Sequence, residues 1–157
     1  NMALLRSDFK LGINTALFGA VFAVILDRLA KVLALHVWSI EPFPIIKHFL
    51  TLGFYKNFFV AFSINPLADP LIISGIIFLL LTAYFFWNIK KRRLGEAAFL
   101  TFMILGAASN IYDRIAYGYV IDYIDLSYFT VFNLADAMIT FGVAALILRQ
   151  LALSRRG

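Results

Sequence analysis

Residues 70–89 are twenty consecutive positions without a charged side chain, reading PLIISGIIFLLLTAYFFWNI. An α-helix rises about 1.5 Å per residue, so this stretch matches the ~30 Å of hydrocarbon in a bilayer. The basic run Lys90-Lys-Arg-Arg93 ends it abruptly. The stretch therefore predicts a membrane-spanning helix, and this prediction decides how the remaining apolar stretches are interpreted.

Three further apolar stretches, 11–36, 94–112 and 131–148, predict three more spans. The chain has 157 residues and is 62% hydrophobic, which exceeds the apolar share of soluble domains and cannot be buried in one this small. We therefore expect an all-α polytopic membrane protein with four transmembrane helices. Residues 1–157 are expected to form a single integral membrane domain.

The segment 38–69 has a different texture. It contains three of the four prolines and Gly53, and residues 49–64 are rich in aromatic side chains. This pattern favours short strands or a hairpin outside the hydrocarbon. An amphiphilic loop resting on the headgroups is an equal alternative, and both descriptions hold for a small sheet lying at the interface. We expect a small β-rich outer (periplasmic or extracellular) segment.

The basic residues predict the orientation of the four spans. Nine of the fourteen lie at the N-terminus, at the turn between spans two and three, or at the C-terminus. By the positive-inside rule these three regions are cytoplasmic, and the segments 38–69 and 113–130 lie on the outer side. This placement accounts for the net charge of +5 without a nucleic-acid partner. The nine residues are Arg6, Lys10, Lys90, Lys91, Arg92, Arg93, Arg149, Arg155 and Arg156.

Cysteine and histidine usage narrows the possible chemistry. The chain has no cysteine, so neither a disulfide framework nor a cysteine-ligated metal is possible. His36 and His48 stand alone, without the HExxH spacing of zinc peptidases. We expect no metal and no cofactor.

The stretch Gly106–Asp136 holds four of the nine acidic residues beside or inside apolar sequence. Acids at membrane depth are costly and indicate function. Asp122 is expected in the outer loop 113–130, and Asp136 about one and a half turns into span four, at ~3.6 residues per turn. Asn133 shares a helix face with Asp136, and Asn110 shares one with Arg114. These groups can converge at the membrane surface.

Two carboxylates held close together cannot both ionise cheaply, so one keeps a proton while the other acts as a base. Such a pair can activate water and hydrogen-bond a scissile carbonyl. The alternative is that Asp136 caps or interrupts its helix, but its place in an apolar span favours function. For Asp113 and Asp125 we favour the role of ordinary loop acids.

Asp27 and Lys31 are spaced i,i+4 and can pair on one face of the first span. This pair either anchors the helix end at the interface or faces a polar pocket, and the sequence favours neither. A small transporter or proton-relay subunit that uses Asp27, Lys31 and Asp136 is the alternative function. Transporters usually show inverted repeats, and the chain shows none. A non-catalytic membrane scaffold would leave Asp136 unexplained.

Five blocks, in order along the chain, resemble those of the bacterial lipoprotein signal peptidases (signal peptidase II). Asp27–Lys31 is similar to D-x-x-x-K, Asn57–Ser63 to N-x-G-x-A-F-S, Gly106–Arg114 to G-A-x-G-N-x-x-D-R, Val120–Ile124 to V-V-D-F-I, and Phe132–Asp136 to F-N-x-A-D. Each block alone is weak, but the ordered set is highly specific. Phe59, Leu105 and Ser109 replace glycines of the pattern.

The resemblance implies an aspartic endopeptidase that removes the signal peptide from diacylglyceryl-modified prolipoproteins, cutting before the lipidated cysteine. The family's catalytic dyad corresponds to Asp122 and Asp136. The implied partners are the prolipoprotein and membrane lipids, and we expect a monomer in the bacterial cytoplasmic (inner) membrane with its active site near the outer face. The supporting or substrate-binding residues are expected to be Asn110, Arg114, Asn133, Asn57, Asp27 and Lys31.

Overall fold

The computed structural model describes residues 2–59 and 69–155, with side chains from residue 13 onward. Its helices are α1 (Met2–Leu33), a π-helical turn η1 (Ala34–Trp38), α2 (Pro70–Lys90), α3 (Leu94–Tyr117) and α4 (Leu134–Ser154). Its strands are β1 (Phe43–Ile46), β2 (Leu50–Asn57), β3 (Val120–Leu126) and β4 (Val131–Phe132). The strands form one antiparallel sheet in the order β1-β2-β3-β4.

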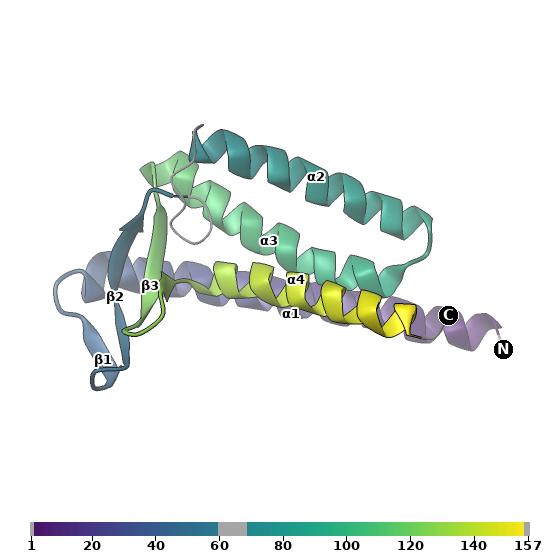
Figure 1. Cartoon of the computed structure of the whole chain (residues 1–157), viewed down its shortest axis with the longest axis horizontal. Helices are drawn as coiled ribbons and strands as arrows, with labels where there is room; N and C mark the ends of the chain where they lie inside the picture. Colours follow the sequence, from purple (N-terminus) through teal and green to yellow (C-terminus); the bar gives the residue numbers. More distant parts are fainter. Residues whose placement is uncertain (1, 60–68, 156–157) are drawn as a thin grey trace.

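The four long helices run alongside one another, and the sheet lies across one end of them (Figure 1). The start of α1, the α2–α3 connection and the end of α4 all lie at the opposite end. The predicted grouping of the basic clusters at one end of the molecule therefore agrees with the fold. Within the described residues, α2, α3 and α4 are long and apolar enough to cross a membrane. The first predicted span, 11–36, falls in α1 and η1 and stays a prediction.

Helix α2 has the surface expected of a helix in lipid. Asp69 caps it by accepting the N–H of Leu71 at 2.7 Å, and Pro70 occupies the first helical position, where its missing N–H costs nothing. Large apolar side chains stay exposed along it, with Leu79 67% exposed. A helix that exposes apolar groups in this way is stable in hydrocarbon and not in water.

The predicted strands in 38–69 are present as the hairpin β1–β2. The prediction that residues 113–130 form a loop is wrong, because most of them lie in α3 and β3. Helix α3 continues to Tyr117, where Gly118 with φ 80° closes it in the left-handed conformation that glycine adopts without strain. The chain then forms β3, because β2 offers an edge whose hydrogen bonds β3 can complete.

The fourth helix starts later than predicted from the apolar run at 131. Val131 pairs with Asp125 of β3 as part of the short strand β4, and Asn133 then caps α4. The helix also ends later than the predicted span 131–148, since α4 continues to Ser154. Asp136 is consequently the third residue of α4 and lies in its first turn, rather than one and a half turns inside.

Glycines let α3 and α4 pack closely beside the sheet. A Cβ atom on Gly106 would lie 2.6 Å from the backbone oxygen of Ala135, and one on Gly142 would lie 2.9 Å from that of Phe99. Both distances are shorter than any real contact, so only glycine permits this approach. The close packing places the first turn of α4, which carries Asp136, directly against α3.

Candidate active site

Asp122 extends from β3 and is 2% exposed. Its two carboxylate oxygens each accept a hydrogen bond from an asparagine side chain. Asn57 Nδ2 donates to Oδ2 at 2.9 Å, and Asn133 Nδ2 donates to Oδ1 at 2.6 Å. The first donor comes from the neighbouring strand β2, and the second from the residue that caps α4, so Asp122 joins the sheet to the helices.

Asp136 is reached by the same capping residue. Its backbone N–H donates to Asn133 Oδ1 at 2.8 Å, while its carboxylate Oδ1 accepts from Asn110 Nδ2 of α3 at 2.7 Å. Asn133 is fully buried, and its NH₂ donates to the carboxylate of Asp122 while its amide oxygen accepts the backbone N–H of Asp136. The structure thus brings Asp122 and Asp136 together across a single side chain.

The three asparagines are held in one orientation each. The amide oxygen of each accepts from a fixed donor, which leaves its NH₂ directed at an aspartate. The donors are Phe59 N for Asn57 at 2.9 Å, Asp136 N for Asn133 at 2.8 Å, and Lys31 Nζ for Asn110 at 3.0 Å. Every predicted asparagine therefore presents donors to the two acids and cannot rotate freely.

The environment of Asp122 keeps a proton available near neutral pH. Burial, and then the negative charge of Asp136, raise the pKa of Asp122 to about 7, against the opposing hydrogen bonds from Asn57 and Asn133. The contribution of Asp136 means that the two carboxyl groups are electrostatically coupled.

Lys31, which orients Asn110, belongs to a largely buried cluster of four charged side chains on α1 and α3. The predicted pair of Lys31 Nζ with Asp27 Oδ2 is present at 2.9 Å. Lys31 also pairs with Asp113 Oδ2 at 2.7 Å, and Arg28 pairs with Asp113 Oδ1 at 2.8 Å. Asp27, Asp113 and Lys31 are at most 2% exposed, so the pair faces a polar interior and does not anchor an exposed helix end.

Our interpretation of Asp113 as an ordinary loop acid is wrong. It lies in α3, is fully buried, and accepts the Ile121 N–H at 3.3 Å in addition to its two ion pairs. The interpretation as an ordinary acid fits Asp125 better. Asp125 is partly buried in β3, lies outside this cluster, and accepts a hydrogen bond from Tyr55 Oη at 2.9 Å. Both residues are nevertheless in regular elements and not in a loop.

Arg114, one of the predicted supporting residues, lies near the end of α3. Among the described residues it makes no ion pair. Instead its guanidinium donates to the backbone oxygens of Phe59 at 2.7 Å and Asn110 at 3.5 Å. Its charge still acts on Asp136 and Asp122. Arg114 therefore ties the end of β2 to α3 and supplies positive charge beside the two acids.

Two hydroxyl groups that the sequence interpretation did not select also contact the cluster. Ser109 Oγ donates to Asp27 Oδ2 at 2.6 Å, and Tyr123 Oη donates to Asp27 Oδ1 at 3.1 Å. For Ser109, its replacement of a glycine in the family pattern was a sequence feature that could have indicated a polar contact at this position. Nothing comparable indicated Tyr123, because aromatic residues are frequent throughout the chain.

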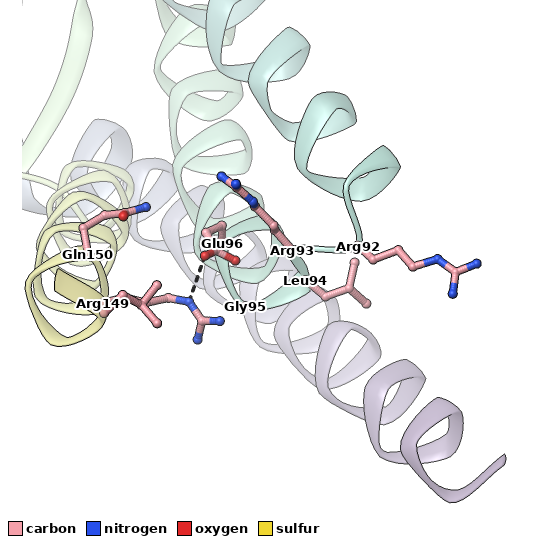
Figure 2. A pocket seen from close by; sticks show the side chains of 8 residues that line it. Arg92, Arg93, Leu94, Gly95, Glu96, Arg149 and Gln150 are labelled. Carbon is pink, nitrogen blue, oxygen red and sulfur yellow. Dashed lines mark ion pairs between the residues drawn. The ribbon is translucent and has the colours of Figure 1, made fainter. Parts of the chain in front are cut away.

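A separate hollow of about 500 Å³ lies at the other end of the helices (Figure 2). Figure 2 shows Glu96 turned toward Arg149, whose Nε lies 3.1 Å from Glu96 Oε1. Neither member of the aspartate pair lines this hollow, so we do not assign the reaction to it. The described residues contain no group of three or more His, Cys, Asp or Glu arranged to hold a metal. The hollow is lined by Arg92, Arg93, Leu94, Gly95, Glu96, Arg149, Gln150 and Leu153.

Residues 19–152 match the family model of signal peptidase II. The chain belongs to the signal peptidase II family. It is 36% identical over 132 residues to the lipoprotein signal peptidase of Halothermothrix orenii, covering 82% of this chain and 89% of that protein. It is 32% identical to that of Staphylococcus aureus, over 90% of this chain and 91% of the relative.

Solved structures agree with this family assignment. One structure of a bacterial membrane enzyme superimposes with a TM-score of 0.76 at 28% identity, covering 88% of each chain. A second gives a TM-score of 0.73 at 29% identity, covering 88% of this chain and 93% of the other. The resemblance inferred from the sequence blocks is confirmed. Asn57 lies in the described part of its block, whereas residues 60–63 of that block lie outside the described residues.

Proposed function

We propose that the protein is an aspartic endopeptidase that removes the signal peptide from diacylglyceryl-modified prolipoproteins, cutting before the lipidated cysteine. Membership of the signal peptidase II family, and the names of the lipoprotein signal peptidases that the chain matches, support this substrate class. The observation that carries the proposal is the position of Asn133, whose NH₂ donates to the Asp122 carboxylate and whose amide oxygen accepts the backbone N–H of Asp136. Asn133 thereby links the buried Asp122 of the sheet to the partly buried Asp136 in the first turn of α4.

Asp122 and Asp136 share one proton in the proposed mechanism. The ionised carboxylate takes a proton from a water molecule, whose oxygen attacks the scissile carbonyl carbon. The protonated carboxyl donates a hydrogen bond to the carbonyl oxygen as charge develops there. Transfer of a proton to the amide nitrogen then allows the C–N bond to break and restores the shared-proton state.

The raised pKa of Asp122 supports this assignment, because the pair holds its proton near neutral pH. When the pH rises past about 7, that proton is lost and both groups are ionised. Two carboxylates cannot donate a hydrogen bond to the carbonyl, so the rate is expected to fall on the alkaline side. At low pH the second carboxylate is protonated as well, and the base is lost.

We place the enzyme in the bacterial cytoplasmic membrane as a monomer and a single domain, with α1 as the first of four spans and both termini in the cytoplasm. The sheet and the aspartate pair then lie near the outer face, since they are at the end opposite the α2–α3 turn (Figure 1). A lipid-modified substrate reaches such a site sideways from the bilayer. Exposed aromatic groups on the hairpin, including Phe43 at 57% and Phe49 at 47%, can rest on lipid or substrate.

The function is tested by incubating the purified protein with a diacylglyceryl-modified prolipoprotein and with the same chain lacking the lipid. We expect cleavage of the lipidated chain only, immediately before the modified cysteine, as read by the masses of both products. A chelator should leave the rate unchanged, because the two acids activate water directly. Cleavage at another bond, or complete inhibition by the chelator, would argue against the proposal.

A further inference from the structure

The first turn of α4 must be held in place for Asp136 to face Asp122. The first N–H groups of a helix have no partner within the helix and need one from outside. Asn133 satisfies the N–H of Asp136, and Asp27 Oδ1 accepts the N–H of Ala135 at 3.2 Å. The remaining N–H of this turn, from Leu134, donates to Tyr123 Oη at 3.1 Å. All three donors of the turn are therefore satisfied.

Tyr123 stands at the junction of the elements that carry the two acids. It follows Asp122 directly on β3, and side chains alternate between the faces of a strand, so the two point in opposite directions. Tyr123 is 4% exposed, and the centroid of its ring lies 6.1 Å from that of the Trp38 ring. Its hydroxyl accepts from Leu134, two residues before Asp136, and donates to Asp27.

We propose that Tyr123 is a positioning residue that sets the separation of Asp122 and Asp136 by tying β3 to the first turn of α4 and to Asp27. This inference rests on the proposed function. Burial and the charge of Asp27 raise the pKa of Tyr123, which keeps its hydroxyl protonated and able to donate.

The tie has a measurable effect beyond stability. Asp122 faces Asp136 from α4, Asn57 from β2, and the charges of Lys31 from α1 and Arg114 from α3. Of these neighbours, only Asp136 carries a negative charge, and its influence weakens if the two acids move apart. A looser tie therefore lowers the pKa at which the pair loses its shared proton. The alkaline limb of the pH–rate profile then moves to lower pH.

The test compares Tyr123→Phe with the intact enzyme. We expect kcat to fall about tenfold, because the acids are less well placed, with KM unchanged. The alkaline limb should shift to lower pH. The matched control is Tyr55→Phe, which removes a hydroxyl bonded to Asp125 in the same sheet. It should leave both kcat and the limb unchanged. If the Tyr123→Phe limb stays at the intact enzyme's position, the inference is wrong, even where stability falls.

A second variant keeps Tyr123 and removes its partner. Leu134→Pro deletes the N–H that Tyr123 accepts, at the first helical position, where proline is tolerated. Asn133 has φ −128° and ψ 174°, a conformation compatible with a following proline. We expect the alkaline limb of this variant to shift to lower pH as well. An unshifted limb would overturn the inference, even if Tyr123→Phe does not fold. No cleavage by the intact enzyme, or activity without Asp122, would instead refute the proposed function.

Discussion

Asp122→Asn and Asp136→Asn are each expected to lower kcat by about a thousandfold or more, and the double variant to be little worse than either single one. The two carboxyl groups act as one unit, so removing either removes the shared proton or the base. In Asp122→Asn, one carboxylate oxygen is also replaced by an NH₂ group. This group cannot accept the hydrogen bond that Asn57 or Asn133 donates at that position. Turnover is measured by the gel shift of a lipidated prolipoprotein.

The control for this loss is Asp125→Asn, the same substitution three residues along β3. Asp125 accepts from Tyr55 Oη and has no contact with the asparagine network, and an amide oxygen can accept that bond as well. We expect near-normal turnover from it. A folded Asp125→Asn protein without activity, or normal turnover from folded Asp136→Asn, would show that the pair is wrongly assigned.

Asp113→Asn is expected to destabilise the protein by about 3 kcal/mol, because removing one member of a buried ion pair leaves its partners uncompensated. Asp113 is fully buried and pairs with both Lys31 and Arg28. Lys31 also orients Asn110 toward Asp136, so activity should fall with stability. Thermal unfolding in detergent measures the change.

Glu96→Gln provides the comparison for Asp113→Asn, since it neutralises an acid of the same helix. Its partner Arg149 is 43% exposed, and an ion pair with solvent on one side contributes less than about 1 kcal/mol. An amide oxygen can also keep the hydrogen bond from Arg149. Equal destabilisation by the two variants would mean that the buried cluster has no special role in stability.

The sequence predicted the helices well where apolar runs are bounded by strong local signals. The second span, predicted at 70–89, matches α2 closely, because Pro70 and the basic run at 90–93 mark its ends. The end of the third span was misplaced at 112, since nothing in a hydropathy pattern shows that Asp113 is neutralised by Arg28 and Lys31 from another helix. Tertiary pairing decides such a boundary.

The residues that gather at the candidate site were predictable from the sequence, whereas their arrangement was not. Asp122, Asp136 and the three asparagines were selected from their blocks and from polar groups in apolar sequence, and the structure brings them together. The local spacing of Asn133 and Asp136 suggested a shared helix face, whereas Asn133 is the cap of α4. The pairing of β2 with β3 depends on contacts distant in sequence, which spacing cannot show.

The proposed mechanism requires Asp122 and Asp136 to share one proton during hydrolysis. The pH dependence of kcat/KM for cleavage of a lipidated prolipoprotein tests it most directly. We expect the rate to fall on both sides of a maximum, with two apparent pKa values that belong to the pair. The alkaline limb should have its midpoint at about pH 7, because burial and the charge of Asp136 raise the pKa of Asp122 to about 7. A rate independent of pH through the neutral range, or one that rises there, would contradict the claim.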